Sequence, residues 1–133
     1  MPEDSMVQRV RLLIEAMNRR DFDAVEAYYA SDAVLCGEAG TFKGAAAIRG
    51  LFEDMLRPYE DFHVEVEEII DLGNGVGFGV IVVTGHPAGS SGEVRFRYAI
   101  VAIWTKGVIK QDMRTVSIDE ARAAAERLAQ ERR

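Results

Sequence analysis

The stretch from Gly75 to Val116 constrains the fold more than any other part of the chain, because it holds three long segments rich in β-branched and aromatic residues. Two short segments with the composition of turns, HPAGSSG and TKG, separate these three segments. Such a pattern is typical of antiparallel strands that follow one another through tight turns. We expect the resulting sheet to form both a ligand pocket and any contact between subunits.

Helices are predicted on both sides of this stretch. Apolar residues at helical spacing indicate an amphipathic helix over residues 3 to 19 that starts near Ser5, and Asp21 can cap a second helix. A third helix is expected over residues 45 to 56, and residues 121 to 133 contain strong helix formers throughout. Helices therefore precede the long strands, and one helix follows them.

Two more strands are predicted before the long ones. Residues 33 to 36 favour a short strand, and residues 62 to 70 alternate apolar with polar side chains, as in a strand with one wet face near a sheet edge. A chain of 133 residues with 48% hydrophobic content is long enough for one domain with a proper core and too short for two. We predict a single α+β domain over residues 1–133.

Composition and charge argue against several classes of protein. The net charge is -6 and the basic residues are scattered, which argues against a nucleic-acid partner. No apolar run approaches the roughly 20 residues that span a bilayer, and the start of the chain lacks the pattern of a signal peptide. The single cysteine, Cys36, cannot form an internal disulfide. We expect a cytoplasmic protein that contacts no membrane and holds no metal, since no metal-binding motif is present.

The register of the long strands predicts which side chains share a face. If the first turn pairs His86 with Phe96, and the second pairs Trp104 with Ile109, then Ala102 lies opposite Gln111. One face then carries aromatic and small polar groups and is predicted to bind a ligand beneath the helices. Its candidate ligand-binding residues are Val82, Thr84, Phe96, Ile100, Trp104, Gln111, Met113 and Thr115.

The opposite face is also apolar at its centre, where Val101 is flanked by residues such as Ile81 and Ile103. In the predicted register, charged residues including Asp112 and Arg114 surround this centre. Three helices can cover only one face of the sheet well, so the other face is expected to pair with a second subunit. An apolar centre with a charged rim fits a homodimer through the sheet.

Five local stretches have a recognisable pattern, namely residues 18–25, 29–34, 42–49, 84–86 and 106–109. Together with the order of the elements, they resemble SnoaL-like proteins of the nuclear transport factor 2-like superfamily. This group includes ketosteroid isomerases, polyketide cyclases and limonene epoxide hydrolases. The resemblance implies a cone-shaped fold with N-terminal helices packed on a strongly curved mixed or antiparallel sheet, a deep pocket, and commonly a homodimer.

The functional residues of two of these enzyme groups do not match this chain. Where ketosteroid isomerases have a tyrosine, an aspartate base and a second aspartic acid, the matching positions here are Leu13, Gly37 and Ile100. Glu38 lies next to the missing base and is a possible substitute. For the catalytic triad of limonene epoxide hydrolases, the nearest matches are Thr84, His86 and Arg114, so that triad is absent as well.

Polyketide cyclases of this group carry a histidine in a Gly-His stretch, which His86 resembles. The acidic partner that cyclases place near the last strand could only be Asp112, which the predicted register turns away from the pocket. His86, Tyr98 and Glu38 are the candidates for catalysis, because imidazole, phenol and carboxylate groups can each transfer a proton or donate to a substrate oxygen. Tyr28 or Tyr29 could donate to a substrate oxygen from the second helix, and Tyr28 is a further candidate ligand contact.

Each candidate also has a structural interpretation. His86 fits a strand-end residue bonded to the following turn, Glu38 fits a solvated turn residue, and the aromatic residues fit a core. The leading functional hypothesis is an isomerase, cyclase or hydrolase that uses no cofactor and acts on a small apolar molecule by acid/base chemistry. The alternatives are a binding protein for an apolar ligand without catalysis, and a dimeric interaction module.

Overall fold

The computed structural model describes residues 5–133. Helices precede the sheet, interrupt it once and follow it. In chain order the elements are α1 (Met6–Asn18), α2 (Phe22–Ala27), β1 (Tyr29–Gly37), β2 (Gly40–Lys43), α3 (Ala45–Leu56), β3 (Tyr59–Asp71), β4 (Val76–Pro87), β5 (Val94–Thr105), β6 (Val108–Thr115) and α4 (Ile118–Glu131).

The starts of the first two helices follow from side-chain caps. The hydroxyl of Ser5 accepts a hydrogen bond from the backbone N–H of Gln8 at 3.1 Å. The carboxylate of Asp21 accepts one from the N–H of Ala24 at 3.2 Å. Both caps satisfy donors that the helix itself leaves unpaired, as predicted from the sequence. Positions 3 and 4 of the predicted first helix lie outside the described residues.

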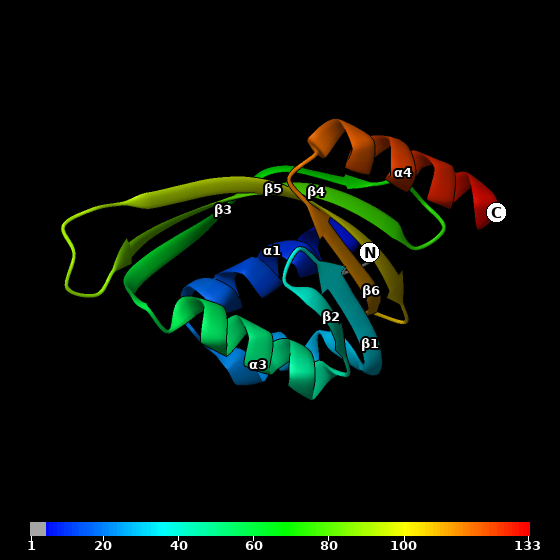
Figure 1. Ribbon diagram of the computed structural model, residues 1–133. Helices are drawn as coiled ribbons and strands as arrows, with labels where there is room; N and C mark the ends of the chain where they lie inside the picture. The colour runs from blue at the N-terminus through cyan, green and yellow to red at the C-terminus, as the bar shows by residue number, and fades with distance from the viewer. Residues whose placement is uncertain (1–4) are drawn as a thin grey trace.

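Within residues 5–133 the strands form one six-stranded sheet in the order β2-β1-β6-β5-β4-β3. Strand β1 runs parallel to β6, and the other neighbours are antiparallel. Figure 1 shows α1 and α3 on one side of the curved sheet and α4 on the other. The predicted α+β fold, with helices packed on a curved mixed sheet and a C-terminal helix, is confirmed. Strand β3 lies at a sheet edge, also as predicted.

The two faces of the sheet belong to two separate cores. The concave face packs against α1, α2 and α3, with Ile48 and Val25 fully buried there. On the convex face, Val101 and Val80 pack against Ala121 and Ala125 of α4. The expectation that Val101 lies at the centre of a free face is wrong, because α4 returns across the sheet and covers it. The homodimer itself stays a prediction.

The predicted pairing of β4 with β5 is also wrong. Val82 pairs with Arg97, and Ile81 pairs with Tyr98. This differs by three positions from the pairing expected, and an odd shift moves every side chain of β4 to the other face. The long connection after Pro87 explains the error, because a loop of this length does not dictate a register as a two-residue turn does.

The pairing of β5 with β6 begins as predicted, with Trp104 opposite Ile109, and then shifts. Ile103 pairs with Gln111, so Lys110 is an extra residue, a β-bulge. Lys110 points outward and binds the carboxylate of Asp32 at 2.7 Å. Beyond the bulge, alternate residues of β6 exchange faces relative to the prediction.

Among residues 5–133, no helix combines the length and the apolar character needed to cross a bilayer.

Candidate functional site

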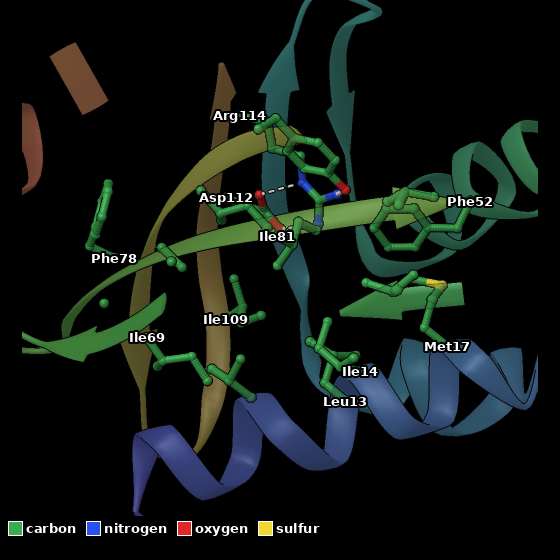
Figure 2. Close-up of a pocket in the computed structure, with 18 of the residues that line it drawn as sticks. Leu13, Ile14, Met17, Phe52, Ile69, Phe78, Ile81, Ile109, Asp112 and Arg114 are labelled. Atoms are coloured by element: carbon green, nitrogen blue, oxygen red, sulfur yellow. Dashed lines mark hydrogen bonds and ion pairs between the residues drawn. The ribbon is translucent and has the colours of Figure 1, made fainter. Parts of the chain in front are cut away.

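A cavity of about 240 Å³ lies between the concave face of the sheet and the helices α1 and α3. Figure 2 shows α1 along one side of it and strands β4 to β6 across from it. Its lining is overwhelmingly apolar, as is typical of small-molecule sites. The apolar lining includes Leu13, Ile14, Met17, Phe52, Val64, Ile81, Val83, Ile100, Trp104 and Ile109.

Four polar side chains gather on the β6 side of this cavity. The Nε and Nη2 atoms of Arg114 donate to the two carboxylate oxygens of Asp112 at 2.9 and 3.0 Å. The hydroxyl of Tyr29 donates to Asp112 Oδ2 at 2.8 Å, and Arg114 Nη1 donates to the hydroxyl of Tyr98 at 3.1 Å. We call Tyr29, Tyr98, Asp112 and Arg114 the polar cluster. Figure 2 shows Arg114 and Asp112 across the cavity from α1.

Arg114 is held rigidly in this cluster. Its guanidinium lies 5.0 Å from the ring centre of Phe52 and 5.6 Å from that of Tyr98. Burial by itself lowers the pKa of Arg114, but the charge and hydrogen bond of Asp112, together with Tyr98 and Tyr29, outweigh burial, and the pKa lies above its ordinary value. Arg114 is therefore a permanent, buried positive charge whose partner carboxylate, on Asp112, is only 1% exposed.

The two tyrosines of the cluster have different hydrogen-bonding roles. Burial, and then the charge of Asp112, raises the pKa of Tyr29, while burial raises the pKa of Tyr98 against the opposing effect of Arg114. Both hydroxyls are therefore protonated at neutral pH. Tyr29 donates its proton to Asp112, whereas the O–H of Tyr98 meets no acceptor within residues 5–133. Tyr98 is thus an available hydrogen-bond donor with a positive charge behind it.

Phe96, Tyr98, Ile100 and Trp104, four of the predicted site residues, line the cavity from β5. Their placement follows from the alternation of side chains between the two faces of a strand, which puts every second residue of β5 on the cavity face. Their roles in ligand binding and catalysis stay predictions.

Five other predicted site residues lie on the convex face and not in the cavity. The shifted pairing of β4 turns Val82 and Thr84 outward, beside Arg97 and Arg95. The bulge at Lys110 turns three residues of β6 outward. These three are Gln111, Met113 and Thr115, and they border a groove beside α4.

His86 lies outside the cavity, so the prediction that it lies in the pocket is wrong. Its role in catalysis stays a prediction. Its Nδ1 atom lies 2.6 Å from Asp61 Oδ1 and its Nε2 atom 3.4 Å from Glu93 Oε2. The hydrogen bond with Asp61 raises the pKa of His86 above its ordinary value, and the negative charge of Asp61 adds to the effect. His86 is a strand-end residue on the convex side, as its structural interpretation predicts, but its hydrogen bond is with Asp61 of β3 and not with the following turn.

Glu38 and Tyr28 also lie outside the cavity, although the sequence predicts them to be in the site. Glu38 lies exposed in the turn between β1 and β2, away from the cavity. Tyr28 ends α2 and packs its ring under the guanidinium of Arg9 at 5.2 Å. The next residue, Tyr29, begins β1 and points into the cavity instead.

Sequence reasoning missed Tyr29, Asp112 and Arg114 as members of one site. The register predicted from the sequence places Asp112 and Arg114 on the rim of a subunit interface, and the bulge at Lys110 turns them into the cavity instead. A weak signal was available, because an aspartate and an arginine two residues apart share one face of any regular strand.

Within residues 5–133, no group of three or more histidine, cysteine, aspartate or glutamate side chains is arranged to hold a metal ion.

Solved structures with the same fold come from several bacteria. A hypothetical protein with a ketosteroid isomerase-like fold from Catenulispora acidiphila, in complex with trimethylamine, is 18% identical with a TM-score of 0.75, covering 91% of this chain and 94% of that one. An LEH-like epoxide hydrolase of M. tuberculosis is 17% identical (TM-score 0.69; 90% and 88% covered). A putative polyketide cyclase of Sinorhizobium meliloti is 20% identical (TM-score 0.68; 86% and 95% covered).

No curated protein matches the sequence. The sequence model of the SnoaL-like domain, in contrast, matches residues 10–111, a span that runs from α1 into β6 and contains most of the cavity wall. The fold shared with solved structures agrees with this match of the sequence, and this chain belongs to the SnoaL-like domain family.

Proposed function

We propose that this protein is an enzyme that acts on a small, largely apolar molecule carrying a hydrogen-bond-accepting oxygen, by acid/base chemistry of its own side chains. The observation that carries this proposal is the polar cluster at the wall of an otherwise apolar cavity. A cavity with a few placed polar groups is the usual form of a small-molecule site.

Tyr98 supplies the acidic half of this chemistry. Its O–H has no acceptor within residues 5–133, and its oxygen accepts a bond from Arg114 at 3.1 Å. A donor backed by a positive charge stabilises negative charge that develops on a carbonyl or epoxide oxygen. Because the surroundings are apolar, that stabilisation is stronger than it would be in water.

Tyr29 and Asp112 supply the basic half. Both oxygens of Asp112 are engaged by Arg114 and Tyr29, so the carboxylate acts through the tyrosine. Tyr29 passes its hydroxyl proton to Asp112 while its oxygen takes a proton from the bound molecule or from water. Such a transfer needs hydrogen-bond contact between the groups, and the 2.8 Å separation provides it.

The family provides the reaction classes to test. SnoaL-like proteins and their nuclear transport factor 2-like relatives include isomerases, cyclases and epoxide hydrolases. All of these reactions develop charge on a substrate oxygen or move a proton next to one. Isomerisation, cyclisation or hydrolysis of an apolar ketone or epoxide is therefore the function we propose.

The experiment incubates the purified protein with a panel of small apolar ketones and epoxides and follows each compound by chromatography with mass detection. We expect conversion of at least one compound, and a loss of about a hundredfold or more in Tyr98→Phe, because general acid catalysis typically contributes that much. His86→Ala is the matched control and should convert normally. Conversion that survives in Tyr98→Phe would contradict the proposal.

A specific observation favours a second candidate, a binding protein without catalysis. Asp112 is held on both oxygens, one bonded to Nε of Arg114 and the other to Arg114 and Tyr29, and so offers no free base to a ligand. In the same experiment, retention of a compound without conversion would support this candidate. The interaction module fits less well, since its cavity would be filled by its own side chains, and here a cavity of about 240 Å³ is open.

A further inference from the structure

The indole N–H of Trp104 has no hydrogen-bond acceptor within residues 5–133, although the residue is only 8% exposed. In this part of the chain, every side-chain nitrogen or oxygen that is fully buried has a hydrogen-bond partner. The Nε1 atom of Trp104 is therefore not sealed in packed protein. It still faces open space.

That open space is the cavity. Trp104 lines the cavity from β5, and Gly77 lines it from the neighbouring strand β4. A Cβ atom added to Gly77 would lie 3.7 Å from Nε1 of Trp104 and would collide with the sulfur of Met6 at 2.6 Å. Gly77 and Ile81 share the concave face of β4, so Nε1 lies on that side as well.

Trp104 is well separated from the donor described above. Tyr98 and Trp104 point to the same face of β5 and lie six residues apart, which corresponds to about 20 Å along a regular strand. Tyr98 lies beside Arg114, whereas Trp104 lies beside Gly77 and Met6. Between them the strand presents only the apolar side chains of Ile100 and Ala102.

An unused donor in an apolar cavity is unfavourable unless a ligand or water satisfies it. Given the proposed function, on which this inference rests, we infer that the ligand carries two hydrogen-bond acceptors separated by an apolar frame. Tyr98 binds one acceptor and the indole N–H of Trp104 binds the other. Trp104 is then a positioning residue that determines which end of the ligand meets the polar cluster.

The test uses three probes with one carbon frame: decalin, its monoketone, and a diketone with a carbonyl at each end. Trp104 is the chain's single tryptophan, so its indole N–H gives one signal in a proton–nitrogen correlation spectrum. We expect the diketone to move the indole proton to low field, and decalin to leave it near its original position. Calorimetry should show the diketone binding about tenfold more tightly than the monoketone.

Variants separate the two donors. In Trp104→Phe the tenfold advantage of the diketone should disappear, and benzothienylalanine at position 104, which keeps a bicyclic ring without the N–H, should behave in the same way. In Tyr98→Phe the advantage of the monoketone over decalin should disappear instead. The spectrum of the unaltered protein is decisive even if a variant fails to fold.

Two further outcomes are distinct. Equal binding of the monoketone and the diketone, both tighter than decalin, with an unmoved indole signal overturns the role of Trp104 and leaves the proposed function standing. Failure of every probe to bind overturns the proposed use of the cavity, and the role of Trp104 with it.

Discussion

Asp112 and Arg114, two residues apart on β6, form a two-point ion pair inside the cavity wall, with N–O distances of 2.9 and 3.0 Å. Their neighbours from other strands and from α3, Tyr29, Tyr98 and Phe52, complete the contacts of the pair. The pair therefore connects the stability of the domain with the electrostatics of its cavity.

Asp112→Ala should destabilise the protein strongly. The substitution leaves the guanidinium of Arg114 buried without its counter-charge, which typically costs about 3–5 kcal/mol. The free energy of unfolding, measured with urea, checks this. The double variant Asp112→Leu with Arg114→Met removes both charges and should recover most of the loss. Equal destabilisation of the single and double variants would mean that packing, and not charge, is the cause.

His86 should make folding stability depend on pH. Its pKa is raised in the folded protein, chiefly by the hydrogen bond with Asp61. The stabilisation is fully present below the unfolded value, about 6.5, and is lost as the pH rises through the higher folded value. Unfolding midpoints of the unaltered protein and of Asp61→Asn, compared from pH 5 to pH 9, should converge at the upper end. A difference that stays constant with pH would contradict this assignment.

Ala102→Trp should abolish ligand binding. Ala102 lines the cavity from β5, where it pairs with Asp112 of the neighbouring strand β6. A large side chain at this position occupies the space that a ligand needs. The retention of decalin monoketone on the protein measures this. Thr84→Trp on the convex face of β4 is the matched control and should retain the compound. Normal retention by Ala102→Trp would place the binding site elsewhere.

The homodimer through the sheet remains a prediction, now with a defined surface. On the convex side beyond α4, the exposed residues Glu65 and Glu67 of β3 and Arg95 and Arg97 of β5 form an acidic and a basic row, and Glu67 and Arg97 are ion-paired with each other within the chain. A two-fold axis parallel to the strands would place each row against the opposite row of the second copy.

Arg95→Glu combined with Arg97→Glu should therefore yield monomers in sedimentation analysis. Val101→Glu tests something different, because Val101 is 4% exposed beneath α4 and its substitution should unfold that core. A charge-reversed variant that sediments as a dimer would rule out this surface, and monomeric unaltered protein would rule out the homodimer.

The fold was largely predictable from the sequence, because it depends on patterns that repeat. The helical spacing in α1, the cap at Asp21 and the alternation along β5 each predicted the element found. The polar cluster was not predictable in the same way. Which face Asp112 occupies depends on one extra residue at position 110, and a single-residue shift leaves the hydrophobic pattern of such a short strand almost unchanged.

The same reasoning explains the misplaced β4 residues. Both faces of this strand are apolar, with Ile81 and Val83 on one side and Val80 and Val82 on the other, and all four are buried. A strand buried on both faces shows no alternation from which to choose between them. Only the pairing with β5 distinguishes the faces.

The bulge at Lys110 also has a consequence for how this protein can diverge. Loss of the codon for Lys110 would remove the bulge and leave Ile103 opposite Gln111 and Ala102 opposite Asp112, so both faces of the strand would keep their side chains. The polar cluster would survive this deletion, and only the ion pair of Lys110 with Asp32 would be lost. A descendant could thus straighten this strand in one step and inherit an unchanged cavity.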